Sequence, residues 1–196
     1  MSIKESIVTV DPTQEPFDLT EAKSVLEIDT ADTSKDSMIQ SNITTAREAA
    51  EAVTGRSLMT QTRVLYLDYF PLGDTITLPN GPVQSVTHVK YYDTDEVEQT
   101  LSSSDYWTDL TKPVARIVIK NYWPSIKCRP NAVTITYVCG YANAVSVPHG
   151  IKSGMKVVVA HLFEHREQNS PVQLYEIPFD AIKMWEPYIL IQDAFY

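Results

Sequence analysis

The 196-residue sequence has little of what several classes of protein require. It contains only two cysteines, Cys128 and Cys139, which are too few for a disulfide framework in a chain of this length. We therefore expect two reduced thiols, as in a cytoplasmic protein, with Cys139 buried in a strand. The six glycines form no phosphate-binding loop. No apolar run approaches the ~18 residues of a membrane span, and residues 1–14 lack the apolar core of a signal peptide, so we expect no membrane association.

Positive charge is also scarce, because 16 basic residues face 25 acidic ones and give a net charge of −9. The excess lies at the two ends. Residues 1–36 contain nine acidic and three basic side chains, and residues 167–196 contain five and one. A conventional DNA-binding protein shows a basic patch, so we expect no sequence-specific binding of DNA. The acidic ends either keep the protein soluble or, if the protein lines a channel, repel DNA so that it slides past.

The composition is that of an ordinary globular protein, with 43% apolar and 21% charged residues. A chain of this length can bury a core without metals or disulfides, most simply in one domain. Pro12 and Pro16 discourage a helix near the start, so residues 1–17 are predicted to form a flexible or extended arm. We expect the main domain over residues 18–168 and a separate C-terminal segment over residues 169–196.

Two helices are predicted directly after the arm, over residues 18–27 and 36–54. Asp18 is expected to cap the first helix with Glu21 as its capping-box partner. Ser34 or Asp36 is the candidate cap of the second. Apolar residues follow the second helix at helical spacing, and Gly55 stands where a glycine commonly ends a helix. These apolar positions are Ile39, Ile43, Ala46, Ala50 and Val53.

Strand signals then follow without interruption up to residue 141, because β-branched and aromatic residues alternate with turn residues. The predicted strands cover residues 61–70, 75–79, 83–93, 97–101, 105–110, 115–120 and 132–141. A third helix is predicted over residues 148–167, and a terminal helix over residues 179–190 with Asp180 as its cap. Runs of helix and runs of strand, rather than alternation, predict an α+β fold with an N-terminal helix pair, a central antiparallel block and C-terminal helices.

The segment His161-Leu162-Phe163-Glu164-His165 fits the H-x-x-E-H pattern of inverted zinc proteases. Two histidines at i and i+4 can bind one zinc ion, with Glu164 as the general base. Glu176 or Glu186 would have to supply the third ligand, and neither has a recognisable context. At ~100° per residue, His165 falls near the middle of the apolar stripe of its helix, and Glu164 points away from that stripe. We therefore prefer histidines that pack on the core, and predict no catalytic residue, metal or cofactor.

The order of several segments resembles the bacteriophage head–tail connector (adaptor) family over roughly residues 18–190. The matching segments are Thr54-Gly55-Arg56 at a helix end, the turn from Leu78 to Pro82 with the valine- and tyrosine-rich strand after it, Arg129–Tyr137 with Gly140-Tyr141, and the helix from Pro148 to Glu167. The resemblance implies a structural protein rather than an enzyme. A stopper-type joining protein is the alternative, but the helix-rich N-terminal part favours the adaptor, because the other joining proteins are mostly β.

Membership of that family implies a position in the virion, at the head–tail junction, after synthesis in the cytoplasm of a bacterial host. The expected assembly is a ring beneath the portal, usually with twelvefold symmetry, that extends the DNA channel toward the tail. The implied partners are further copies of the chain, the portal protein and a downstream head-completion or tail protein. Genomic DNA would pass through the ring without sequence-specific binding.

Two sets of residues are candidates for contacts in such an assembly. The small side chains of the second helix and the arginine after its end are candidates for subunit contacts, although internal packing of the alanines is equally compatible with the sequence. These candidates are Ala46, Ala49, Ala50 and Arg56. Aromatic side chains in a short terminal segment are common interface anchors. The candidates for docking on the portal are Tyr175, Phe179, Trp185, Tyr188, Phe195 and Tyr196, and the alternative is a tail that folds back onto its own core.

Overall fold

The computed structural model describes residues 5–164 and 177–190 of the chain. These residues form two compact units. The β unit contains residues 5–12, 60–140 and 190, and the helical unit contains residues 13–59, 141–164 and 177–189. The expectation of one main domain over residues 18–168 stays a prediction. The expected boundaries at residues 17 and 169 stay predictions.

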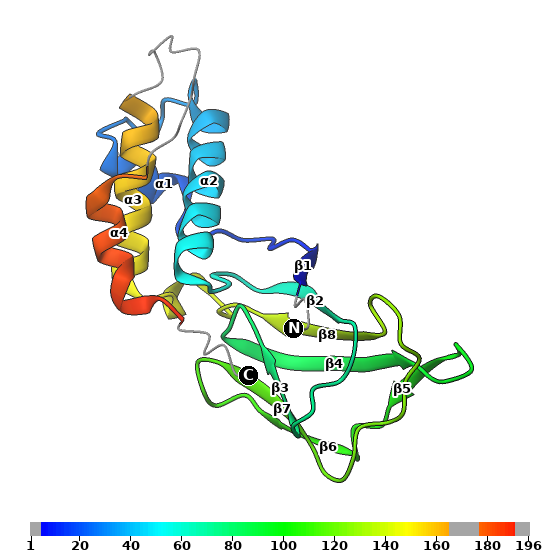
Figure 1. The fold of residues 1–196 in the computed structure, drawn as a ribbon. Coiled ribbons are helices and arrows are strands. Elements are labelled where there is room, and N and C mark those ends of the chain that lie inside the picture. The colour runs from blue at the N-terminus through cyan, green and yellow to red at the C-terminus, as the bar shows by residue number, and fades with distance from the viewer. Residues whose placement is uncertain (1–4, 165–176, 191–196) are drawn as a thin grey trace. The chain divides into compact units, whose positions relative to one another are not determined.

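The β unit consists of two antiparallel sheets, drawn in Figure 1. The larger sheet has the strand order β1-β2-β8-β4-β5, and the smaller one has the order β3-β7-β6. The strands are β1 (Glu5–Val10), β2 (Gln61–Leu67), β3 (Thr75–Leu78), β4 (Val83–Tyr92), β5 (Glu98–Leu101), β6 (Tyr106–Asp109), β7 (Ala115–Ile119) and β8 (Val133–Cys139). All seven predicted strands are therefore confirmed, and the α+β class with its order of helices and strands is confirmed as well.

One apolar core lies between the two sheets of the β unit. Successive side chains of a strand point to opposite faces, and β7 and β8 accordingly alternate between buried and half-buried residues along their whole length. The buried row of β8 meets buried residues of the smaller sheet, such as Ile76 and Ile117, in a single cluster. Cys139 belongs to this buried row, as the sequence predicted.

Residues 5–10 form the strand β1, which is the extended one of the two conformations expected for the N-terminal arm. The strand pairs antiparallel with β2, with Ile7 opposite Val64. The Ser6 hydroxyl also lies 2.9 Å from the hydroxyl of Tyr137 on β8. Four consecutive residues of this strand, Ile7 to Val10, are β-branched, which favours extended backbone. Pro12 and Pro16 lie after the strand and do not interrupt it.

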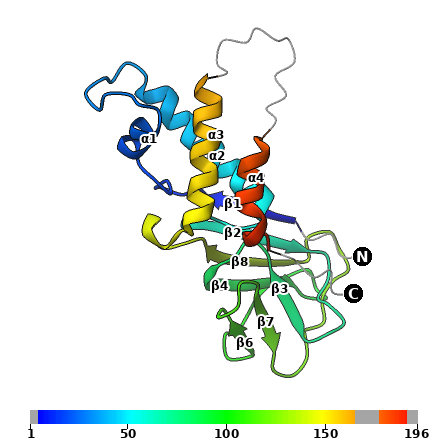
Figure 2. The ribbon, with the colours of Figure 1, turned by 90° about the vertical axis from the view of Figure 1, so that its left-hand side faces the viewer.

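The helical unit contains four α-helices. They are α1 (Leu19–Val25), α2 (Asp36–Thr54), α3 (His149–Glu164) and α4 (Phe179–Trp185), with 3₁₀ turns η1 (Ala144–Ser146) and η3 (Glu186–Tyr188). Figure 2 shows α2, α3 and α4 side by side. Their buried faces share one cluster, in which Ile39, Ile43 and Met155 have no exposed surface. The predicted end of the third helix, at residue 167, lies outside the described residues.

The helix ends agree only partly with the predicted caps. Asp18 caps α1 by accepting the backbone N–H of Glu21 at 2.8 Å, and Gly55 ends α2 in the left-handed conformation with φ of 66°. Ser34 and Asp36 do not cap α2, because Lys35 holds the cap position without a side-chain hydrogen bond. The carboxylate of Asp36 instead forms an ion pair with Lys23 at 2.5 Å.

The predicted cap of the last helix is also wrong. Pro178, not Asp180, precedes the first residue of α4, and no side chain caps that end. Asp180 lies inside the first turn, where an acidic side chain still interacts favourably with the helix dipole. No helix within the described residues is both long enough and apolar enough to cross a membrane.

Candidate functional site

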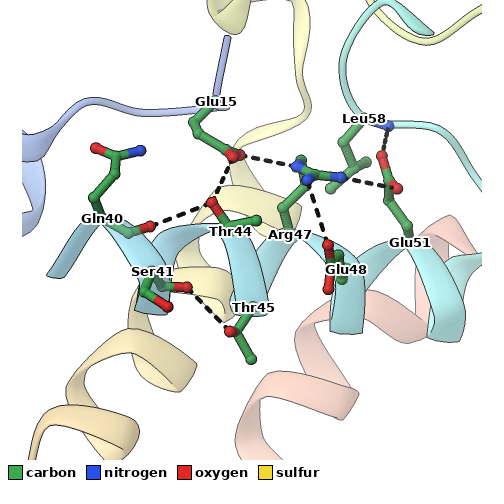
Figure 3. Close-up of polar contacts among 9 residues, drawn as sticks. All are labelled: Glu15, Gln40, Ser41, Thr44, Thr45, Arg47, Glu48, Glu51 and Leu58. Carbon is green, nitrogen blue, oxygen red and sulfur yellow. Dashed lines mark hydrogen bonds and ion pairs between the residues drawn. The ribbon is translucent and has the colours of Figure 1, made fainter. Parts of the chain in front are cut away.

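A nearly buried arginine on α2 connects three carboxylates in the helical unit, as Figure 3 shows. Arg47 is only 7% exposed. Its Nε donates to Glu15 Oε2 at 2.9 Å, and its Nη1 donates to Glu51 Oε2 at 3.3 Å. The third carboxylate, that of Glu48, lies 3.7 Å from Nη2 on the exposed side. The second oxygen of Glu15 accepts the hydroxyl of Thr44 at 2.9 Å. The segment that precedes α1 is therefore bound to α2 through the Glu15 carboxylate.

The same network fixes the chain that leaves the C-terminal end of α2. The second carboxylate oxygen of Glu51 accepts the backbone N–H of Leu58 at 2.7 Å, and Leu58 is fully buried. The i, i+4 spacing of Arg47 and Glu51 is visible in the sequence and favours a pair on one helix face. Glu15 lies 32 residues from Arg47, so no local pattern predicts their contact. The network thus joins residues before, within and after α2.

The four candidates for subunit contacts have different environments. Ala46 and Ala50 have no exposed surface and belong to the core of the helical unit, so both pack internally, as one of the two alternatives had it. Ala49 is half-buried at the edge of that core. Arg56 is half-buried as well, and its Nε donates to the backbone oxygen of Tyr188 at 2.6 Å. Ala49 and Arg56 keep accessible surface and stay candidates.

Trp185, a candidate for docking on the portal, is instead fully buried in the helical unit. Its indole N–H donates to the backbone oxygen of Ile151 on α3 at 3.0 Å. The indole ring lies against Gly154, where any Cβ would collide with its Nε1 atom. Four residues earlier, a Cβ at Gly150 would lie 2.8 Å from the ring of Tyr188, another docking candidate. Two glycines of α3 therefore leave room for the aromatic side chains of α4 and η3.

Among the docking candidates that the structure describes, Phe179 is the exposed one. Its side chain is 68% exposed, and the ammonium of Lys183 lies 5.3 Å from its ring centre. Lys183 also forms an ion pair with Glu186 at 2.8 Å. Phe179 is therefore free to contact another protein. Three further candidates lie outside the described residues, namely Tyr175, Phe195 and Tyr196.

A rigid aromatic contact in the β unit was not anticipated from the sequence. The rings of Phe70 and Trp123 are stacked with centres 4.7 Å apart, and the Trp123 indole donates to the backbone oxygen of Gly73 at 2.8 Å. These contacts hold the β2–β3 and β7–β8 loops together. Each loop also presents a strongly exposed apolar side chain, Leu72 in the first and Tyr122 in the second. The concentration of aromatic residues in both loops was the available signal.

The H-x-x-E-H segment is only partly described by the structure. His161 and Glu164 lie on α3, with His161 half-buried and Glu164 exposed, and His165 lies outside the described residues. Within residues 5–164 and 177–190, no group of three or more histidine, cysteine, aspartate or glutamate side chains has the geometry of a metal site.

The pKa of one carboxyl group at the surface of the β unit, that of Asp109, is lowered by its neighbours. Asp109 accepts the hydroxyl of Thr111 at 2.7 Å, and its other oxygen lies 3.0 Å from Nη2 of Arg116. The hydrogen bond from Thr111, followed by the contacts with Arg116, lowers the pKa of this carboxyl below its ordinary value. The Asp109–Arg116 contact links the end of β6 to β7.

Comparison with solved structures shows the same fold in chains of gene transfer agent particles. One similar chain comes from the neck of an empty gene transfer agent particle computed with C6 symmetry, at 21% identity and a TM-score of 0.72, with 97% of this chain and 96% of that chain covered. A chain of the native gene transfer agent virion has the same identity and TM-score, with 92% and 94% covered. A chain from the native neck computed with C12 symmetry has 21% identity and a TM-score of 0.64, with 93% and 94% covered.

No curated protein matches the sequence. A family model described as phage gp6-like head-tail connector protein matches residues 17–129, which is more than half of the chain. The matched region contains α1, α2 and the strands β2 to β7. The chain therefore belongs to the phage gp6-like head–tail connector family.

Proposed function

We propose that this protein is a phage adaptor that assembles as a ring beneath the portal and extends the DNA channel toward the tail. The observation that carries the proposal is the family match over residues 17–129. The similarity of fold to neck chains over nearly the whole length supports it. The proposed place of action is the head–tail junction of the virion.

The proposed ring has cyclic symmetry, and the C6 and C12 symmetries with which the similar necks were computed support this proposal. A closed ring requires two different surface patches on each subunit that fit each other head to tail. Ala49 and Arg56 are proposed members of such a patch, because both keep accessible surface. The proposed symmetry on the virion is twelvefold.

The acidic surface near the start of the helical unit fits passage of DNA without binding. Glu27, Asp29 and Asp32 are exposed in the connection between α1 and α2, which also contains the half-buried Lys35, and Lys23 on α1 is buried. Lys23 donates to the backbone oxygens of Thr30 and Asp32 and so is turned into this loop. A surface of this charge repels the phosphate backbone of DNA.

Docking on the portal is proposed to use Phe179 and the C-terminal segment. Exposed aromatic side chains are frequent anchors of protein interfaces, and Trp185 is unavailable because it is buried. The partners are then the portal protein on one side and a head-completion or tail protein on the other.

Portal binding by Phe179→Ser tests this assignment, with Tyr122→Ser as the matched control. Tyr122 is an even more accessible aromatic residue, 90% exposed, but it belongs to the β unit. We expect the Phe179 variant to co-sediment with purified portal at least tenfold more weakly than the native chain, a loss of about 1.4 kcal/mol. The Tyr122 variant is expected to bind like the native chain. Unchanged binding by the Phe179 variant contradicts the assignment of the docking surface.

A further inference from the structure

The side chain of Gln84 on β4 binds the chain at two of the four places where it passes from one unit to the other. These crossings follow residues 12, 59, 140 and 189. The Gln84 Nε2 donates to the hydroxyl oxygen of Thr60 at 2.8 Å and to the backbone oxygen of Gly140 at 2.8 Å. Thr60 is the first residue of the β unit after the second crossing, and Gly140 is the last one before the third. One amide group therefore connects two crossings that are far apart in the sequence.

A β-bulge on β4 accounts for the direction of the Gln84 side chain. Val83 lies opposite Cys139 and Ser85 lies opposite Val138, so Gln84 is one extra residue on the β4 side of this pairing. An extra residue interrupts the regular alternation of a strand and re-aims its side chain. Gln84 is exposed, so its two hydrogen bonds hold the crossings at the surface and not through burial in the core.

Both crossings are short, because the chain is also held in the helical unit directly beyond them. Before the second crossing, the backbone N–H of Leu58 donates to Glu51 on α2 at 2.7 Å. After the third crossing, Tyr141 packs against the core cluster of the helical unit. Gly140 has a φ of 100°, a backbone conformation that glycine adopts readily and other residues avoid. The freedom of these crossings is therefore confined to a few residues, and Gln84 binds one residue at each of them.

We propose that Gln84 is a latch on the hinge between the two units, and that loss of its two hydrogen bonds increases the rotation of one unit relative to the other. Units of one chain move relative to each other by default, and hinges lie at a few residues where elements end. Thr60 directly precedes β2 and Gly140 directly follows β8, so both have this position. A hydrogen bond at the surface is exchanged for bonds with water at little cost, so the latch opens without unfolding either unit. This inference concerns motion within one chain and does not depend on the proposed function.

The distribution of distances between two spin labels, measured by pulsed electron–electron double resonance, tests the latch. The first label is attached to Cys128, which is exposed in the β unit, while the buried Cys139 stays unlabelled. The second is attached at Ser41→Cys, an exposed position of α2 in the helical unit. Gln84→Met preserves the length of the side chain but has no N–H donor. We expect this variant to have a distance distribution about twofold broader than that of the labelled native chain.

Gln99→Met is the matched control for the same labelled protein. Gln99 on β5 also donates from its amide, to Asp93 at 2.8 Å, but both residues lie within the β unit and away from the crossings. Its distance distribution should have the width of the native one. An unchanged width in the Gln84 variant, or equal broadening in the Gln99 variant, overturns the proposal.

Hydrogen exchange of the Gly140 amide, followed by NMR, provides a second readout without labels. This N–H donates to the backbone oxygen of Pro82 at 2.8 Å. Gln84→Met should accelerate its exchange several-fold, because local opening of the crossing exposes the N–H to water. The amide of Ile135, in the middle of β8 between two paired strands, should exchange as slowly as in the native protein. Unchanged exchange at Gly140, or equal acceleration at Ile135, overturns the proposal.

Discussion

Substitution of Gly154 by alanine probes the contact that fixes the last helix of the described chain. A Cβ at this position would overlap the indole Nε1 of Trp185, which has no exposed surface and donates to Ile151. Alanine in a helix interior gains about 1 kcal/mol over glycine. Overpacking a tight core costs about 1–3 kcal/mol of stability, and straining the indole hydrogen bond costs about 1 kcal/mol more. The expected net loss of stability is therefore about 1–3 kcal/mol.

Urea denaturation followed by tryptophan fluorescence measures this loss, and Gly73→Ala is the matched control. No heavy atom lies within 4 Å of a Cβ built at Gly73, so that variant should stay within about 0.5 kcal/mol of the native protein. Trp185→Phe in the Gly154→Ala background should recover part of the loss, because phenylalanine lacks the colliding nitrogen. If Gly154→Ala is as stable as the native chain, Trp185 is not held against α3 as described.

Two further substitutions test the charged contacts. Arg47→Met should destabilise the protein by about 3 kcal/mol in urea denaturation, because the largely buried Glu15 and Glu51 lose their cation. The control, Arg56→Met, removes one hydrogen bond and should cost only about 1 kcal/mol. Equal losses of stability in the two variants would refute the role of the Arg47 network. The pKa of Asp109 is lower in the folded protein than in the unfolded chain, so ionised Asp109 stabilises the fold at pH values above its unfolded-state pKa. This stabilisation is lost as the pH falls through the folded-state pKa. Asp109→Asn should therefore flatten the decline in stability as the pH falls below about 4, the ordinary pKa of an aspartate. A decline parallel to that of the native chain would contradict the assignment.

Local patterns in the sequence were sufficient for most elements. The helical spacing from Ile39 to Ala50 and the position of Gly55 predicted α2 with its observed bounds, because burial of one helix face repeats with the helical period. Apolar residues at every second position predicted β7 and β8, because alternate side chains of a strand are buried on one face of its sheet. The pairing of β1 with β2 was not predicted. A short strand at the edge of a sheet is defined mainly by the strand it pairs with, and β2 lies more than fifty residues away in the sequence.

The candidate site depended more strongly on tertiary contacts. The sequence showed that the C-terminal segment is rich in aromatic residues. It did not show which of these side chains are buried and which are exposed. The glycines of α3 make that distinction, since they leave room for Trp185 and Tyr188 while Phe179 stays exposed. The contact of Glu15 with Arg47 likewise joins distant segments of the chain. Pairings of this kind depend on packing and leave no periodic signal.

Assembly with the portal is the central claim, and particle mass tests it most directly. Light scattering with negative-stain imaging measures the mass of the purified chain alone and after mixing with the portal of the same phage. The proposed function predicts a ring of about twelve subunits, formed either by the chain alone or on the portal. A monomer under both conditions would contradict it.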